Sequence, residues 1–455
     1  MIPLGSWILW LLFLSAAGNL VYRLFRKQQR KGKRKAKYMS AYKNQKIERL
    51  SHDQLKRMEH GSFEFFSEET AEFQDLILEN LKNETAPLTF NNSLDIFTDG
   101  NRKFDALLAD IRSAENHVHL QYYIFKNDEI GRRLIDLLIE KALEGVKVLI
   151  LYDDVGSKKL PKEAFEGLFK AGGKAVALLP SKLLKSNPRI YYRYHRKIVV
   201  IDGHISYIGG FNVGNEYVGK SAEFGYWRDT HLRIQGNAVH SLQHRFLLDW
   251  NRASKKHSVK YDDAYFPSSI PVDGIAMQTI SSGPDSSFEQ IKNGFLKMID
   301  LAKSSILIQT PYIIPDDAFL EALRKAAFRG VDVRVMIPIK SDHPFVDAAS
   351  LSFTRELMAA GIIIYQYSNG FLHAKTIIVD SKVFSVGSAN MDIRSFSLNY
   401  EANVFVYDRE MAKKMVGIFL ADAELSKMLT IEAFRNRSLI DHIKERVARL
   451  MAPIL

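Results

Sequence analysis

The sequence predicts an α/β protein with two pseudo-symmetric halves around a shared active-site cleft, preceded by an N-terminal transmembrane helix. Three observations lead to this prediction. The order strand, helix, strand occurs twice, a polar motif occurs once in each half, and an uncharged apolar segment lies near the N-terminus. We therefore expect a transmembrane anchor at residues 1–22, a basic and helical connecting segment at 23–90, a first half at 91–260 and a second half at 261–455.

The first element is the apolar segment from Ile2 to Tyr22, which has no charged residue and is about long enough to cross a bilayer. Arg23 to Lys37 follows it, with nine Lys or Arg residues and no acidic one. A cleaved signal peptide is the alternative, but its charges would precede the apolar stretch. We therefore expect an uncleaved, single-pass anchor in the cell membrane, with the catalytic region in the cytoplasm by the positive-inside rule.

The charge of the chain is concentrated in that basic run. This run contributes +9 of the net charge of +11, so the rest of the chain carries only about +2. A broad basic surface, as nucleic-acid binding requires, is not predicted, whereas the run itself suits anionic membrane lipid. The chain has no cysteine, which excludes disulfides, thiolate catalysis and Cys-ligated zinc.

The two halves repeat one pattern of secondary structure. The first reads HVHLQYYIF as a strand, GRRLIDLLIEKALEG as a helix and VKVLILYDD as a strand. The second reads SILIQTPYIIP, DAFLEALRKAAFRG and VDVRVMIPI in the same order. Gly145 and Gly330 close the two helices, as is typical of a parallel-sheet α/β unit. Two such units are expected to pack as a pseudo-twofold pair.

Each half then carries a strand that begins with a His and a Lys two positions apart. Side chains of a strand alternate between its faces, so this His and Lys point the same way. An Asp lies five residues after each Lys, and a small pair followed by an Asn lies beyond it. The matched positions are His195, Lys197, Asp202 and Asn212 in the first half and His373, Lys375, Asp380 and Asn390 in the second.

A duplicated His and Lys suits in-line displacement at phosphorus. That reaction needs a nucleophile on one side of the phosphorus and a proton donor for the leaving oxygen on the other, which one motif cannot supply. With two halves, one imidazole attacks, the other protonates, and the Lys and Asn side chains surround the non-bridging oxygens. Two ammonium groups provide the positive charge that a metal would bring, so no metal or cofactor is expected.

Two groups of carboxylates accompany the motifs. Asp229 and Glu401 each open a later strand and are candidate partners that fix the tautomer of a histidine. Ion pairs with Arg228 or Arg394 are the alternative for them. The motif aspartates Asp202 and Asp380 follow buried strands in turns, a position more suited to organising a loop than to contacting phosphate.

The paired His-x-Lys-x4-Asp motifs, followed by Gly-Gly-x-Asn or Gly-Ser-x-Asn, resemble the phospholipase D superfamily. The stretches YYIF, QTPYIIPD, MDIRSFSLNYE and RLMAPIL are similar to bacterial cardiolipin synthases. The resemblance implies two phospholipase D-like α/β/α halves, in which the motif residues His195, Lys197, Asp202, His373, Lys375 and Asp380 are catalytic and Asn212 and Asn390 bind substrate, with Asp229 and Glu401 in support.

The resemblance also implies the reaction and its direction. His195 would be the nucleophile that forms a phosphatidyl-histidine, and His373 the general acid and later the base, although symmetry alone permits the reverse. Two molecules of phosphatidylglycerol would give cardiolipin and glycerol. Another phospholipase D-type phospholipid hydrolase or phosphatidyltransferase is the main alternative. The near-neutral charge of the catalytic part argues against a nuclease, and the two intact motifs argue against an inactive scaffold.

Overall fold

The computed structural model describes residues 45–65, 67–83, 86–179, 191–268, 274–284, 288–339, 344–432 and 439–451. The predicted membrane anchor and the basic run lie outside these ranges. Within them, no helix combines the length and the apolar character needed to cross a bilayer.

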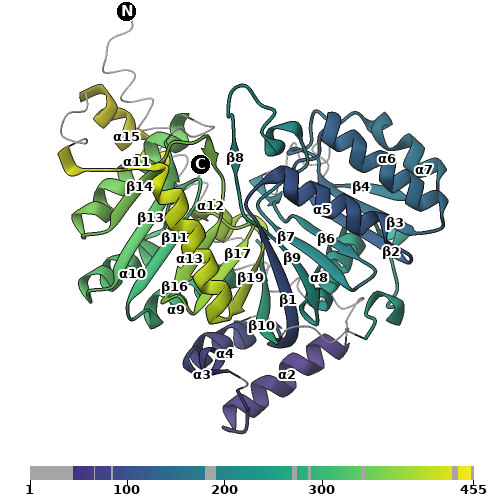
Figure 1. Ribbon diagram of the computed structural model, residues 1–455, viewed down its shortest axis with the longest axis horizontal. Helices are drawn as coiled ribbons and strands as arrows, with labels where there is room; N and C mark the ends of the chain where they lie inside the picture. Colours follow the sequence, from purple (N-terminus) through teal and green to yellow (C-terminus); the bar gives the residue numbers. More distant parts are fainter. Residues whose placement is uncertain are drawn as a thin grey trace, which may run out of the picture.

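One mixed sheet of sixteen strands runs through the described part of the chain (Figure 1). Its centre is the antiparallel pair β1 and β10, and the strands follow in the same order on both sides of this pair. Outward through the first half, the strands are β1 (Thr89–Phe97), β9 (His231–Gly236), β7 (Ile205–Gly209), β6 (Ile198–Ile201), β2 (His117–Tyr122), β3 (Lys147–Asp153) and β4 (Lys174–Leu178). Outward through the second half, they are β10 (Ile275–Ser282), β19 (Asn399–Tyr407), β17 (Val383–Gly387), β16 (Thr376–Val379), β11 (Ser305–Gln309), β13 (Asp332–Pro338), β14 (Ile363–Tyr367) and β20 (Ser426–Met428).

The expected parallel sheet is present only in the outer part of each half. β2, β3 and β4 are parallel, as are β11, β13 and β14. The motif strands β6 and β16 instead run antiparallel to both of their neighbours, so a fully parallel unit is wrong for them. The reason is a tight turn after each motif strand, where Asp202 and Asp380 adopt positive φ values of 52° and 53° and the chain returns as a hairpin.

Helices cover both faces of the sheet, which gives three layers. In the first half, α5 (Gly100–Arg112) and α6 (Glu129–Leu143) pack on one face, and α8 (Ala238–Ala253) packs on the other. In the second half, α9 (Gln290–Leu301), α10 (Asp317–Phe328) and α11 (Pro344–Ala359) oppose α13 (Arg409–Glu424). All four residues of β6 and of β16 are buried, which confirms the prediction that these apolar strands are covered on both faces.

The connecting segment is part of the core of the second half. Its helices α2 (Gln45–Glu59), α3 (Glu68–Glu72) and α4 (Gln74–Asn83) lie below the junction of β1 and β10 in Figure 1. Leu76 and Ile77 are fully buried in the same apolar cluster as Phe295 and Met298 of α9. Asn80 donates a hydrogen bond to Gln278 of β10 at 3.1 Å. This segment therefore stabilises the second half rather than only preceding the first.

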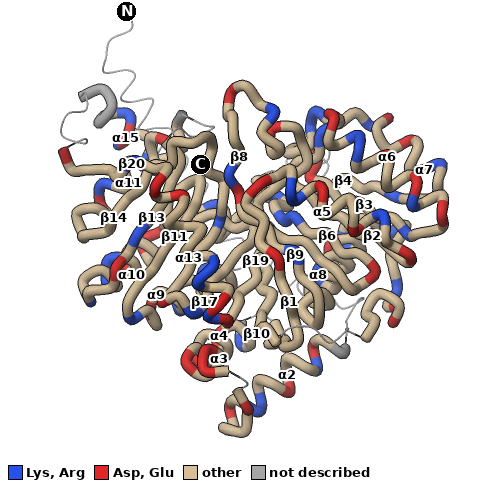
Figure 2. The backbone as a smooth tube through the Cα atoms, in the orientation of Figure 1, with Lys and Arg blue, Asp and Glu red and all other residues tan. Residues whose placement is uncertain are grey.

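The C-terminal helix α15 (Leu439–Met451) packs on α11 of the same half. Arg449 forms an ion pair with Glu356 at 2.5 Å, and its guanidinium lies 4.3 Å from the ring centre of Phe353. Basic and acidic positions are interspersed over both halves (Figure 2), in keeping with the low net charge predicted outside the basic run.

Candidate active site

The first motif enters the site along a strand of the opposite half. β5 (Arg193–Tyr194) runs parallel to the start of β19, where Tyr194 lies opposite Tyr400. The pairing continues by one residue, because the backbone N–H of His195 donates to the carbonyl of Tyr400 at 2.9 Å. His195 is therefore placed beside the next residue of β19, Glu401. The ring nitrogen Nδ1 of His195 lies 3.0 Å from both oxygens of that carboxylate.

The second motif repeats this arrangement with the halves exchanged. β15 (Phe371–Leu372) runs parallel to β8 (Trp227–Arg228), and the backbone N–H of His373 donates to the carbonyl of Arg228 at 2.7 Å. The next residue after Arg228 is Asp229. Nδ1 of His373 donates to Oδ2 of Asp229 at 2.6 Å.

Each histidine is thus completed by a carboxylate from the other half. The sequence singled out Asp229 and Glu401 but not this crossing. Their alternative pairing with arginines is wrong, since Arg228 forms an ion pair with Asp422 at 2.8 Å and Arg394 donates to the carbonyl of Tyr191 at 3.2 Å. Because Nδ1 donates to a carboxylate, the other ring nitrogen, Nε2, carries the lone pair in a neutral ring.

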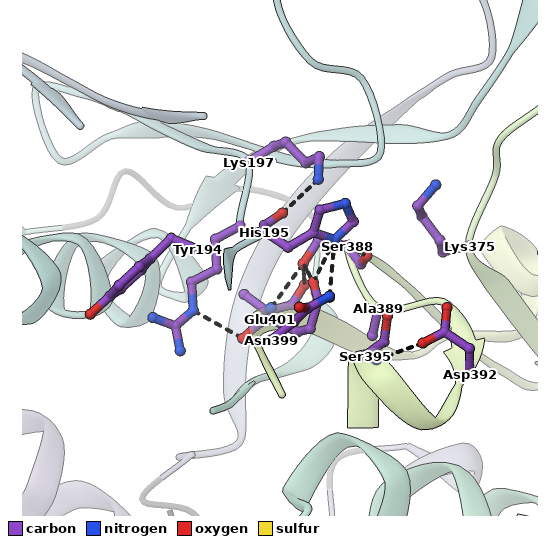
Figure 3. A network of polar contacts seen from close by, with 12 residues as sticks. Tyr194, His195, Lys197, Lys375, Ser388, Ala389, Asp392, Ser395, Asn399 and Glu401 are labelled. Carbon is purple, nitrogen blue, oxygen red and sulfur yellow. Dashed lines mark hydrogen bonds and ion pairs between the residues drawn. The ribbon is translucent and has the colours of Figure 1, made fainter. Parts of the chain in front are cut away.

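The two carboxylates are held by different neighbours. Glu401 accepts hydrogen bonds from the hydroxyl of Ser388 and, at 3.1 Å, from Nδ2 of Asn399 (Figure 3). Asp229 accepts one from the backbone N–H of Thr230 at 2.7 Å. A Cβ on Gly210 would lie 1.9 Å from Oδ1 of Asp229. The Gly-Gly and Gly-Ser pairs of the two motifs therefore differ because each fits its own carboxylate.

The motif lysines lie close to both histidines. Nζ of Lys197 donates to the carbonyl of His195 at 2.6 Å, and Nζ of Lys375 donates to that of His373. Figure 3 shows Glu401 on one side of the His195 ring and the amines of Lys197 and Lys375 on the other. Both amines are buried, and burial lowers the pKa of Lys197. A phosphate anion bound beside the amines would favour their charged forms and would interact with them with little solvent screening.

Burial and charge set the protonation of these groups. Burial, with the charge of Lys375, lowers the pKa of His373 to about 4, and burial also lowers the pKa of His195. Burial alone would raise the pKa values of Asp229 and Glu401, but the neighbouring lysines and histidines lower both. Near neutral pH the site therefore holds two neutral imidazoles and two carboxylates.

The two motif asparagines lie in different surroundings. Oδ1 of Asn212 accepts from the backbone N–H of Ile124 at 3.1 Å, and its Nδ2 donates to the hydroxyl of Tyr217 at 3.1 Å. Asn212 therefore holds the chain that follows β2. Oδ1 of Asn390 is buried without a hydrogen-bond partner among the described residues. Asn390 is the better placed of the two to meet a substrate.

The motif aspartates hold the turns that follow the motif strands. The prediction that Asp202 and Asp380 are catalytic is therefore corrected. Asp202 accepts hydrogen bonds of 2.7–2.8 Å from the backbone N–H groups of three successive residues, the last of which is His117. Asp380 likewise accepts from three successive N–H groups, ending at Ser305. Each Asp lies beyond the far end of a four-residue strand from its histidine, a span of roughly 13 Å or more.

Several residues near the histidines were not predicted. The ring of Tyr123 lies 4.9 Å from that of His195, and Trp227 lies 5.2 Å from His373. Burial raises the pKa of Tyr123, and the charges of Arg193 and Arg394 oppose this only in part. Their positions in the sequence could have indicated them, since Tyr123 directly follows β2 and Arg193 lies two residues before His195. In the ranges that the structure describes, no group of three or more His, Asp or Glu side chains could hold a metal ion.

Comparisons with known proteins agree with this architecture. The model of the family described as "Cardiolipin synthase, PLD-like domain" matches residues 107–250 and 295–423. The chain is 50% identical to the major cardiolipin synthase ClsA of Bacillus subtilis over 453 residues, which cover 99% of this chain and 93% of that protein. It is 48% identical to a cardiolipin synthase of Staphylococcus aureus over 452 residues, which cover 99% of this chain and 91% of that protein.

A solved structure shares the fold at low sequence identity. The crystal structure of phosphatidylserine synthase from Haemophilus influenzae superposes with a TM-score of 0.64 at 13% identity, covering 86% of this chain and 100% of that one. One assignment follows from the two motif-bearing halves of the mixed α/β sheet, the matched family model and the full-length relatives. The chain belongs to the cardiolipin synthase family of phospholipase D-like proteins.

Proposed function

We propose that the protein is a phosphatidyltransferase that converts two molecules of phosphatidylglycerol into cardiolipin and glycerol. The observation that carries the proposal is the crossed pair of dyads, His195 with Glu401 and His373 with Asp229, with both motif lysines beside them. The names of the relatives supply the substrate class, since they are cardiolipin synthases.

In the first step, His195 is the nucleophile. Its Nε2 lone pair forms a bond to the donor phosphorus while the bond from phosphorus to the glycerol oxygen breaks. Glu401 stabilises the positive charge that develops on the ring, because it accepts the hydrogen bond from Nδ1. The amines of Lys197 and Lys375 lie where the non-bridging oxygens would be held.

His373 supplies the proton that the departing glycerol oxygen needs. In the substrate-free protein its pKa of about 4 leaves it neutral at pH 7, owing to burial and to Lys375. A bound phosphodiester anion offsets the charge of the lysines and so raises this pKa. Substrate binding itself thereby favours the imidazolium form of the acid.

The second step reverses the first with a new alcohol. The terminal hydroxyl of the acceptor phosphatidylglycerol attacks the phosphorus, its proton passes to the now neutral His373, and the bond from phosphorus to Nε2 of His195 breaks. Lys197 and Lys375 hold the phosphate oxygens in both steps, whereas Oδ1 of Asn390, which has no hydrogen-bond partner among the described residues, can accept a hydrogen bond from a substrate hydroxyl. Neither step needs a co-reactant beyond the two lipids.

We also propose the membrane arrangement and the domain limits that the sequence predicts. Residues 1–22 would anchor the chain, with the catalytic halves at 91–260 and 261–455 on the cytoplasmic side. Because the apolar segment and the basic run lie outside both repeats, removal of residues 1–37 is expected to leave a folded protein with weaker membrane attachment. Co-sedimentation with phosphatidylglycerol vesicles measures the attachment, and failure of the shortened chain to fold would show that the limits are wrong.

The direct test of the function uses purified protein and bilayers of phosphatidylglycerol. Cardiolipin and glycerol are expected in equal amounts by mass spectrometry. Formation of phosphatidic acid alone would refute the synthase and favour a hydrolase. With an activated p-nitrophenyl phosphatidyl ester, His195→Ala should trap no covalent lipid, whereas His373→Ala should still load His195, because this leaving group needs no proton. An adduct on His373 in the His195→Ala variant would reverse the two roles.

A further inference from the structure

Two arginines outside the repeated motifs lie along the chain that leads into His195. Arg193 belongs to β5, and Arg394 belongs to the short helix α12 (Ile393–Ser397) of the other half. Nη1 of Arg193 donates to the carbonyl of Tyr192 at 2.6 Å, and Nη2 of Arg394 donates to that of Tyr191 at 3.2 Å. The two guanidinium groups are therefore bound to consecutive peptide groups, and each half contributes one of them.

Both arginines are hydrogen-bonded to the chain that leads into the nucleophile. Arg193 and His195 are two residues apart in an extended segment, so their side chains leave the same face about 7 Å apart. Tyr123 lies next to His195, with ring centres 4.9 Å apart. Burial raises the pKa of Tyr123, and the charges of Arg193 and Arg394 both act against this rise.

The two positive charges are near enough to repel each other. Burial and the charge of Arg193 lower the pKa of Arg394. The carboxylates of Asp153 and Asp392 act in the opposite direction on the pKa of Arg394. Each also accepts a backbone hydrogen bond, Asp153 from the N–H of Tyr194 at 3.1 Å and Asp392 from that of Ser395 at 2.5 Å. An anion bound between the arginines would relieve this repulsion.

We propose that Arg193 and Arg394 bind the phosphodiester of the acceptor lipid. The inference rests on the proposed function, in which the donor phosphorus is bonded to His195 and the acceptor hydroxyl attacks it. The acceptor's own phosphate is separated from that hydroxyl by only the three carbons of glycerol. It must therefore lie near His195, beside the stretch of chain leading into this residue, to which both guanidinium groups are hydrogen-bonded. Guanidinium groups suit this task because they bind phosphate oxygens in pairs.

This site would decide between transfer and hydrolysis. Binding of the acceptor phosphate orients the glycerol hydroxyl toward the phosphatidyl-histidine and raises its effective concentration there. Water has no phosphate and gains nothing from the arginines. The site thus selects an anionic glycerophospholipid as acceptor, whereas the two lysines act on the donor phosphorus.

The test compares Arg193→Gln, Arg394→Gln and the double variant with the unmodified protein. Arg334→Gln is the control, because Arg334 forms an ion pair with Asp332 at 2.7 Å on β13 of the outer sheet. On phosphatidylglycerol bilayers, the ratio of cardiolipin to phosphatidic acid should fall by roughly 10- to 100-fold in the Gln variants and stay unchanged in the control. Loading of His195 from the p-nitrophenyl ester should fall far less, since that step uses no acceptor.

The outcomes separate the inference from the function. Cardiolipin formation by the unmodified protein with an unchanged ratio in the Gln variants would overturn the acceptor site and leave the function standing. Phosphatidic acid as the only product of the unmodified protein would overturn both. If a Gln variant fails to fold, Arg394→Lys keeps the charge and loses the paired geometry. A smaller fall in the ratio is then expected, and an unchanged ratio would again refute the site.

Discussion

Replacing Glu401 by Gln tests whether the crossed carboxylate stabilises the reacting histidine. The amide keeps a similar shape and can still accept the hydrogen bond from Nδ1 of His195, so the change removes mainly the negative charge. In the unmodified protein this charge lies 3.0 Å from Nδ1. The ring becomes a cation when Nε2 bonds to phosphorus, and the variant should therefore destabilise that intermediate and the transition state before it.

The size of the effect follows from the distance. Two unit charges 3–4 Å apart at an effective dielectric constant of 20 interact by about 4–5 kcal/mol, which corresponds to roughly 10³- to 10⁴-fold in rate. Asp229→Asn should slow turnover of phosphatidylglycerol by a similar factor through His373. The two variants differ on the p-nitrophenyl ester, where only Glu401→Gln should slow the loading of His195.

The assay is release of p-nitrophenol in a single turnover, with trapping of labelled phosphatidyl on the protein. Glu410→Gln is a matched control, because Glu410 forms an exposed ion pair with Lys413 at 2.8 Å away from the dyads. Thermal unfolding checks that Glu401→Gln remains folded. Loading of the Glu401→Gln variant as fast as the unmodified protein would refute the reasoning.

Three further predictions concern the surroundings of the site. Asp202→Ala and Asp380→Ala should each lower the free energy of unfolding, measured in urea titrations, by about 2–4 kcal/mol, because each leaves three backbone N–H groups without an acceptor. The kcat of both variants should change little, and a stable but inactive variant would contradict this prediction. Burial lowers the pKa of His117 to about 4, so the unfolded chain, with an ordinary His pKa of about 6.5, binds more protons between these values. Its contribution to stability is present above about pH 6.5 and is lost as the pH falls toward 4, and His117→Gln should flatten this part of the curve of melting temperature against pH; an equal slope would exclude His117 as its source. Gly210→Ser should reduce cardiolipin formation at least about tenfold, since the new Cβ would displace Asp229, and unchanged activity would show that the carboxylate can shift without loss.

The sequence predicted the contents of the site better than its connections. The spacing of the repeat predicted both histidines and both lysines, and the position at the start of a later strand predicted the two carboxylates. It could not pair Glu401 with His195, because a repeat describes what each half contains and not which half reaches into the other. The crossing depends on the pairing of β5 with β19. The strand at Arg193 and Tyr194 has only two residues, which is too short for a periodic pattern that would predict a strand.

For the fold, too, the sequence predicted individual elements better than the way in which they pair and pack. The buried strand from Ile198 to Ile201 was predicted, but an apolar run covered on both faces has the same pattern in parallel and antiparallel sheets. Its direction is set by the turn at Asp202, which the sequence analysis noted without inferring a hairpin. The docking of α4 on the second half was missed because the apolar face of a helix, with Leu76 and Ile77, does not specify its partner.

The docking of α4 on the second half also affects the order of events during synthesis on the ribosome. The hydrogen bond of Asn80 cannot form until its partner Gln278, 198 residues later in the chain, has been synthesised. At about 5–20 residues per second, roughly 10–40 s pass before that partner is made. During this interval Phe73, Leu76, Ile77 and Leu81 lack the surface of β10 and α9 that covers them in the native fold, so the nascent chain presents a hydrophobic segment that a chaperone would bind.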